Sequence, residues 1–207
     1  MYVPAHFEET RPEVLRRLIH DHPLAALVTL GSDGLNANHI PMELDADPAP
    51  LGTLRGHVAR ANPQWNLPPM GDAMAMFMGL DAYISPSWYP SKIEHHKVVP
   101  TWNYVAVHAY GPVEFFEDAD RLLEIVTRLT KLHEQPRAEP WAVTDAPEAF
   151  IRAQLKGIIG LRLPITRIEG KRKMSQNRTA ADRAGVVAGL GASERASDRA
   201  VAALIPD

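Results

Sequence analysis

Cysteine is absent from this chain of 207 residues, and several kinds of site are excluded with it. Without a thiol there is no disulfide, no cysteine nucleophile and no cysteine-ligated zinc or iron–sulfur cluster. Long apolar runs are also missing: the N-terminal segment lacks the apolar core of a signal peptide, and no stretch approaches a membrane span. These absences predict a cytoplasmic protein without membrane contact.

The chain has no excess of positive charge, since its net charge is −3 and its pI about 6.3. Taken as a whole it therefore offers no electrostatic basis for binding nucleic acid. Three catalytic or nucleotide-binding signatures are missing as well: the Gly-x-Ser-x-Gly elbow, the Walker loop and the Rossmann glycine run. Nine histidines are present, but none is spaced as a helical metal-ligand pair, and the adjacent His95 and His96 would point to opposite faces of a strand. We predict no dedicated metal site.

What is present is the composition of an ordinary globular protein, with 45% hydrophobic and 23% charged residues. Short apolar segments at close spacing, joined by hairpin turns such as Ser32-Asp33-Gly34, favour one antiparallel barrel over βαβ units. The expected strands are 24–30, 35–44, 51–58, 73–79 with 82–85, 101–116 with a bend at 111–112, and 158–169; the expected helices are 10–20, 118–132, 145–156, 182–189 and 193–204.

Three local expectations follow from the same patterns. The apolar run 24–30 suits a strand that is buried on both faces. Asp145 and Glu148 are spaced as a capping box at the start of a helix, and Gly157 is placed to end that helix in the left-handed conformation. We divide the chain into a barrel domain, residues 1–170, with a helical insertion at about 118–157, and a C-terminal segment, residues 171–207, with a basic stretch and short helices.

The stretch from Tyr83 to Tyr104, YISPSWYPSKIEHHKVVPTWNY, gathers aromatic rings, hydroxyl groups and lysines on a proline-broken connection. Aromatic residues on a loop often line a binding surface, but such a loop can also pack its own rings as a cap. Trp88 is the better candidate for contact with a planar ligand, because Trp102 lies in an expected strand and suits the core. Lys92 and Thr101 add a cation and a hydroxyl group.

Two further segments carry groups suited to a phosphate or a heterocycle. In Arg55-Gly-His57-Val-Ala-Arg60-Ala-Asn62-Pro, a strand delivers a histidine and Arg60 follows at the start of an expected helical turn, an arrangement that suits a phosphate. The alternative is that Arg60 is exposed to solvent and binds no ligand. The segment from Lys173 to Arg178 offers cations with Ser175, Gln176 and Asn177, which could bind the polar edge of a ring or form an exposed basic linker.

With these motifs the chain resembles the PaiB family of FMN-binding negative transcriptional regulators over nearly its whole length. The resemblance rests on MYVPAHF, N-x-N-H-I-P around His39, G-H-V-A-R-A-N-P, YISPSWYPSK, V-P-T-W-N-Y and K-M-S-Q-N-R. It implies an α+β, mainly antiparallel split β-barrel of the pyridoxamine-phosphate-oxidase kind, and a homodimer that holds FMN at the subunit interface.

The resemblance also implies roles for individual residues. His57 and Arg60 would contact the flavin phosphate, with Lys92 as a further contact. The residues that would surround the ring and the ribityl chain are Asn38, His39, Thr101, Trp102, Lys173, Ser175, Gln176 and Asn177. Asn62 and Trp88 are further candidate cofactor residues.

Three functions remain open. The first is a flavin-binding negative regulator, for which direct contact with DNA has little support in the sequence. The second is an FMN-dependent oxidoreductase acting on a small molecule, with unassigned catalytic residues. The third is a barrel that binds another planar ligand, such as haem with a histidine as axial ligand.

Overall fold

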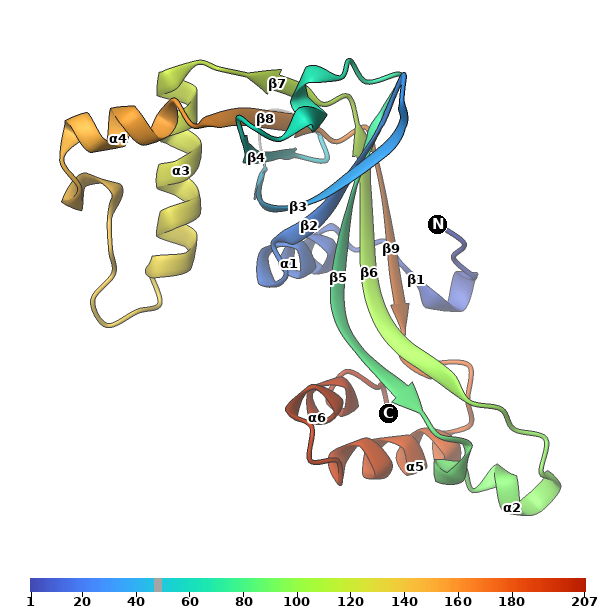
Figure 1. Cartoon of the computed structure of the whole chain (residues 1–207). Coiled ribbons are helices and arrows are strands. Elements are labelled where there is room, and N and C mark those ends of the chain that lie inside the picture. Colours follow the sequence, from blue (N-terminus) through green and yellow to red (C-terminus); the bar gives the residue numbers. More distant parts are fainter. Residues whose placement is uncertain (47–49) are drawn as a thin grey trace. The chain divides into compact units, whose positions relative to one another are not determined.

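The computed structural model describes residues 1–46 and 50–207 and shows an α+β fold with mainly antiparallel strands (Figure 1), which confirms the predicted fold class. No helix in the described ranges is long and apolar enough to cross a membrane. The helices are α1 (Pro12–Asp21), α2 (Ser91–His95), α3 (Ala119–Glu134), α4 (Glu148–Leu155), α5 (Ala180–Gly191) and α6 (Ala196–Ala202), with short 3-10 turns η1 (Ala5–Phe7), η2 (Pro63–Asn66), η3 (Pro86–Trp88) and η4 (Val143–Asp145). The strands are β1 (Glu8–Glu9), β2 (Leu24–Gly31), β3 (Gly34–Asp45), β4 (Thr53–Ala59), β5 (Ala73–Ile84), β6 (Thr101–Gly111), β7 (Glu114–Phe116), β8 (Ile158–Pro164) and β9 (Arg167–Lys173).

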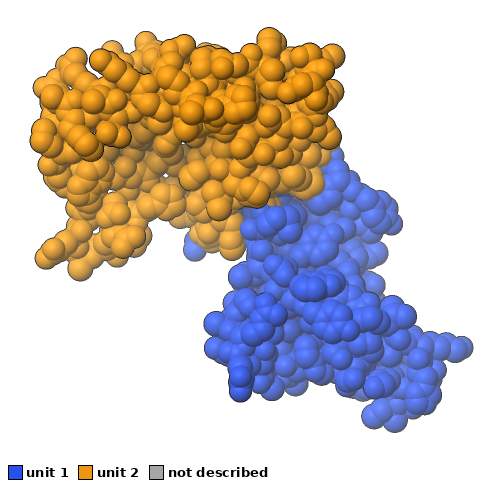
Figure 2. Space-filling view, viewed as in Figure 1, with its two compact units in different colours: residues 1–18, 78–107, 169–207 blue, residues 19–77, 108–168 orange. Residues whose placement is uncertain are grey.

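The chain forms two compact units, each assembled from segments that are separated in the sequence (Figure 2). Unit 1 contains residues 1–18, 78–107 and 169–207, and unit 2 contains residues 19–77 and 108–168. The division into domains at residue 170 stays a prediction, because the two units are defined by contacts and not by independent folding.

Unit 2 is built on antiparallel strands in the order β5, β2, β3, β4, β8, β7. The predicted hairpin joins β2 to β3: Gly31 pairs with Gly34, and Gly34 has φ +110°, which glycine adopts without strain. Helix α3 packs against β3, β4 and β8 with Leu122, Ile125 and Leu129 buried. This side of the helix matches the apolar stripe that the sequence predicts.

Strand β2 shows that burial on both faces was the wrong expectation for residues 24–30. Leu24 and Leu30 are 58% and 44% exposed, whereas Ala25 and Leu27 are fully buried. The strand lies in an antiparallel sheet with one face in the core and the other at the surface, so burial alternates along it.

Unit 1 contains the pairing of β1 with β9, the main part of β6 and the second part of β5. Helices α5 and α6 contact each other and share a core with strand residues and the aromatic stretch. That core consists of Ala82, Ile84, Tyr89, Val105, Met174, Val186, Leu190, Val201 and Ile205.

Several boundaries differ from the sequence-based expectations. Residues 158–169 are not one strand, because the amides of Ile165 and Thr166 leave the ladder and donate to the carbonyl groups of Gly52 and Tyr110. The expected capping box is wrong: Asp145 lies in η4, where its carboxylate accepts from the Ala142 amide at 2.8 Å, and α4 starts three residues later. The left-handed end at residue 157 is also wrong, since the described glycines with positive φ are at 34, 52 and 71.

Candidate functional site

His57 lies on β4 of unit 2, at a position where one side of the strand is only partly buried. Its Nδ1 atom is buried and has no hydrogen-bond partner among the described residues. Burial lowers the pKa of His57, so the ring is held neutral near pH 7. An orphaned ring nitrogen of this kind is a group that a bound ligand can satisfy.

Arg60 follows β4 but does not begin a helical turn as expected. Its Nε donates to the carbonyl of Lys156 at 2.6 Å, and its Nη1 forms an ion pair with Glu117 at 2.7 Å. The 3-10 turn begins at Pro63 and is capped by Asn62, whose side chain accepts from the Gln64 amide at 2.9 Å. A phosphate would therefore have to compete with the Glu117 carboxylate for Arg60.

Gln64 is a polar residue of the core that the sequence did not single out. It is fully buried, and its Nε2 donates to the Leu27 carbonyl at 3.2 Å and the Thr29 hydroxyl at 3.1 Å. Its Oε1 accepts from Asn38 at 3.0 Å. Two predicted cofactor residues, Asn38 and Asn62, thus hydrogen bond to one buried glutamine, while His39 next to Asn38 is exposed.

In unit 1, the structure brings together Lys173, Thr101 and Trp102. The Lys173 ammonium group donates to the Thr101 hydroxyl and to the Trp102 carbonyl, the latter at 2.8 Å. Burial and, to a smaller extent, the positive charges of Lys171 and Arg178 lower the pKa of Lys173. These three cations form a local positive region that favours an anionic group.

The segment after Lys173 is held by its own hydrogen bonds. Ser175 is buried and has φ +61°, and its hydroxyl exchanges hydrogen bonds with the side chain of the buried Asn103. Gln176 accepts from the Met174 amide at 2.6 Å and donates to the Arg172 carbonyl, so both ends of its amide are occupied. Asn177 is exposed and borders a cavity of unit 1 with Arg178 and Ser91.

The burial of the two tryptophans is the reverse of what the sequence predicts. Trp88 packs against the core of unit 1, with its ring over Gly189 of α5. Trp102 is 50% exposed and makes an edge contact with Tyr83, their ring centroids 6.0 Å apart. The expectation that Trp102 belongs to the core is wrong, because its side chain lies on the outward face of β6. Lys92 is exposed in α2, where its Nζ reaches the Ser87 hydroxyl at 3.4 Å.

No group of three or more histidine, aspartate or glutamate side chains in residues 1–46 and 50–207 is arranged to hold a metal ion. His95 and His96 lie at the end of a helix and not on a strand as assumed from the sequence, and His96 has φ +56°.

Comparison with known proteins supplies independent information on the chain. The family model described as "Putative FMN-binding domain" matches residues 1–167. His57 and Arg60 lie inside the matched range, whereas Lys173, Ser175, Gln176 and Asn177 lie beyond it.

Two curated relatives cover most of the chain. The chain is 32% identical over 208 residues to the Protease synthase and sporulation protein PAI 2 of Bacillus subtilis, covering 100% of this chain and 97% of that protein. It is 34% identical over 227 residues to an uncharacterized protein of Emericella nidulans, covering 92% and 90%. Among solved structures, the FAD and Heme binding protein of Mycobacterium smegmatis has a TM-score of 0.59 at 20% identity, covering 80% of this chain and 73% of that chain. That last likeness concerns the fold alone.

Proposed function

The chain belongs to the family of FMN-binding domains and is a PaiB-like protein, and from this membership we propose that it binds FMN and acts as a negative transcriptional regulator. The single observation that carries the flavin proposal is the buried Nδ1 of His57 on β4, which has no hydrogen-bond partner in residues 1–46 and 50–207 and lies within the residues that the family model matches. The family resemblance suggests a phosphate contact for this residue, and no described side chain competes for its ring nitrogen.

The candidate residues fit FMN in their chemistry. In unit 2, His57 and Arg60 suit a phosphate. The guanidinium group of Arg60 can bind phosphate oxygens through paired donors, and His57 offers a ring nitrogen. In unit 1, Lys173 and Thr101 suit the polar edge of a ring, and the exposed ring of Trp102 suits an aromatic surface. When bound, FMN would supply electron and hydride transfer, which no side chain of this chain can provide.

Regulation is proposed to act through a partner protein or a metabolite in preference to direct contact with DNA. The net charge of −3 gives no global attraction to a polyanion. Direct binding to DNA would instead be supported if the protein retarded DNA of its own promoter in a gel and the affinity fell steeply as the salt concentration rose. Each contact with a DNA phosphate adds to that salt dependence.

A homodimer is part of the same proposal. Tyr83 and Trp102 in unit 1 are 46% and 50% exposed and lie in contact with each other. Large apolar side chains that gather at a surface often mark an interface. A second copy of the chain is the partner that we propose for this surface.

The flavin proposal is tested by titrating the purified apoprotein with FMN and following flavin fluorescence. We expect His57→Leu, Arg60→Gln and Lys173→Gln each to weaken binding by about tenfold, the loss of one charge-assisted hydrogen bond. Arg152→Gln is the matched control, because Arg152 is an exposed arginine of α4 that forms an ion pair with Glu148 one helical turn away. Protein that leaves FMN fluorescence unchanged at every concentration would contradict the proposal.

The same preparation separates a regulator from an oxidoreductase. Bleaching of the flavin by NADH or NADPH, followed by turnover on an added acceptor, would assign the protein to the FMN-dependent oxidoreductases. Flavin that is bound but gives no turnover supports a regulatory role.

A further inference from the structure

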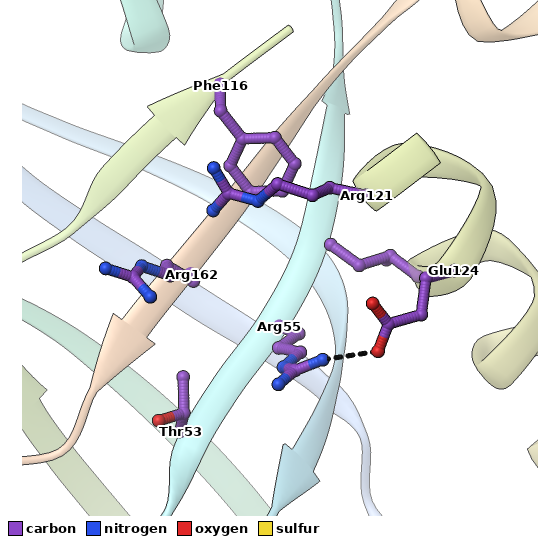
Figure 3. A pocket seen from close by; sticks show the side chains of 7 residues that line it. Thr53, Arg55, Phe116, Arg121, Glu124 and Arg162 are labelled. Atoms are coloured by element: carbon purple, nitrogen blue, oxygen red, sulfur yellow. Dashed lines mark hydrogen bonds and ion pairs between the residues drawn. The ribbon is translucent and has the colours of Figure 1, made fainter. Parts of the chain in front are cut away.

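A small cavity of unit 2 lies beside α3, on the face of the sheet that this helix covers, and guanidinium groups surround it (Figure 3). Its volume is about 120 Å³. Arg55 reaches it from β4, Arg162 from β8 and Arg121 from α3, and Thr53 adds a hydroxyl group. We call these four residues the arginine pocket; the other lining residues are Phe116, Glu124 and Ile125.

The strand register places two of these arginines directly opposite each other. Arg55 of β4 pairs with Arg162 of β8, so their side chains leave the sheet on the same face. Like charges at opposed positions destabilise a pair of strands unless an anion lies between them or beside them. Glu43 pairs with Arg55 and Glu114 pairs with Arg162, so a row of two cations flanked by two carboxylates crosses four strands.

The neighbouring carboxylates compensate only part of the hydrogen-bonding capacity of the guanidinium groups. Arg55 is paired with Glu124 at 2.7 Å and with Asp45 at 2.8 Å. Glu114 is shared: Arg121 donates to its Oε1 at 3.1 and 3.2 Å, and the Nε of Arg162 donates to its Oε2. Within the described part of the chain, neither Nη group of Arg162 has a hydrogen-bond partner.

The side chains of the arginine pocket are fixed by partial burial and by contact with an aromatic ring. Arg121 stacks over the Phe116 ring with its guanidinium carbon 3.6 Å from the centroid. The Arg55 side chain is 22% exposed, whereas that of Arg162 is 48% exposed, so the pocket is reached from solvent on the Arg162 side. Burial alone would raise the pKa of Glu114, but the hydrogen bonds from Arg162 and Arg121 outweigh it and the pKa is lowered.

We propose that the arginine pocket binds a small tetrahedral oxyanion of the phosphate class, at a site separate from that of the flavin. Donors come from three elements and from different directions, which suits a tetrahedral oxyanion better than a planar carboxylate. The anion would lie between the opposed Arg55 and Arg162 and accept hydrogen bonds from the Nη groups of Arg162 that no described residue occupies. Arg55 belongs to a segment that the sequence already suggested for a phosphate, but Arg121 and Arg162 were not candidates, because the arrangement depends on the pairing of distant strands.

The probe is inorganic phosphate, titrated by calorimetry into protein in a chloride buffer at constant ionic strength, without flavin. We expect saturable binding that Arg162→Gln and Arg121→Gln each weaken by about tenfold, the size of one charge-assisted hydrogen bond. Arg152→Gln, the exposed arginine of α4, should leave the affinity unchanged. Thr53→Val removes only the hydroxyl group and keeps every charge, so it should weaken phosphate binding even if an arginine variant fails to fold.

Two results would overturn the proposal. Binding that does not saturate, or that Arg152→Gln and Arg162→Gln weaken equally, would show a diffuse effect of charge. A loss of FMN affinity in Arg162→Gln, or competition between FMN and phosphate, would assign the pocket to the flavin and not to a separate anion. The phosphate titration needs no cofactor, so its outcome is independent of the flavin proposal.

Discussion

Ser175 and Asn103 form a buried polar pair that fixes the start of the segment after β9. Asn103 is fully buried, and its Nδ2 donates to the Ser175 hydroxyl at 3.0 Å while its Oδ1 accepts from that hydroxyl at 3.3 Å. Ser175 has φ +61°, a conformation that costs a residue with a side chain about 1 kcal/mol or more. The pair therefore stabilises a backbone conformation that the sequence alone would not favour.

Substituting Ser175 separates the hydrogen bond from the backbone strain. Ser175→Ala leaves a buried amide without its partner and keeps the strain, so we expect a loss of about 1–3 kcal/mol in the free energy of unfolding. Ser175→Gly loses the same hydrogen bond but removes the strain, so its loss should be smaller. Urea unfolding of both variants measures the difference. If Ser175→Gly were the less stable variant, the argument that relief of backbone strain offsets part of the lost hydrogen bond would be wrong.

The buried His57 predicts a dependence of stability on pH. Burial lowers its pKa in the folded state below the ordinary value of 6.5, so the unfolded chain binds a proton more readily than the folded one. The stability that this neutral ring contributes is fully present above the unfolded pKa and is lost as the pH falls through the folded pKa. A comparison between variants isolates the contribution of His57.

We expect His57→Gln to lose less stability than the unsubstituted chain between pH 8 and pH 5. The measurement is the free energy of unfolding in urea across that range, with exposed His39→Gln as the control. Identical pH profiles for all three proteins would show that His57 is not desolvated in solution.

At the scale of elements, helix α5 approaches the 3-10 turn η3 through glycines. A Cβ at Gly189 would overlap the Trp88 ring, and one at Gly185 would overlap the Trp88 carbonyl oxygen. Close approach of this kind requires glycine at both positions, although glycine lowers helix propensity by about 1 kcal/mol relative to alanine. The contact explains why Trp88 is packed.

Gly185→Ala should therefore separate α5 from η3. Because the obstructing atom belongs to the backbone, we expect a loss of about 1–3 kcal/mol or more in the free energy of unfolding. Gly191→Ala lies at the end of the same helix, and apart from the backbone of that helix and the chain neighbours no atom of the described residues comes within 4 Å of the added Cβ, so this variant should stay within about 0.5 kcal/mol of the original stability. Chemical unfolding of the two variants makes the comparison, and equal losses would contradict the packing argument.

Most elements could be predicted from local sequence, because period-2 and period-3.6 patterns and turn residues are local signals. Helix α3, whose Asp118 side chain accepts from the Arg121 amide at 2.9 Å, and the β2–β3 hairpin are examples. Helix α2 was missed because Ser91–His95 is short and follows a proline. The bend between β8 and β9 was missed because distant carbonyl groups, at Gly52 and Tyr110, accept its amides.

At the scale of the whole molecule, the proposed homodimer gives a measurable expectation. Trp102→Glu places a charge on the exposed aromatic pair with Tyr83, and we expect it to convert a dimer into a monomer. Trp141→Glu is the matched control, since Trp141 is 49% exposed but lies in unit 2 outside the proposed surface. Light scattering coupled to size-exclusion chromatography gives the mass of each variant. A monomeric unsubstituted chain would rule the proposal out.

The sequence by itself determined the fold class, the order of most elements and the family, because those depend on local patterns and on long motifs in a fixed order. Only the tertiary structure decided which polar groups already have partners within the protein. Arg60 forms an ion pair with Glu117, Asn38 and Asn62 form hydrogen bonds with Gln64, and Ser175 forms hydrogen bonds with Asn103. The tertiary structure also decided that Arg55, Arg121 and Arg162 meet around one cavity. The physical reason is that a hydrogen bond or ion pair between distant segments depends on strand register and helix packing, which no local pattern records.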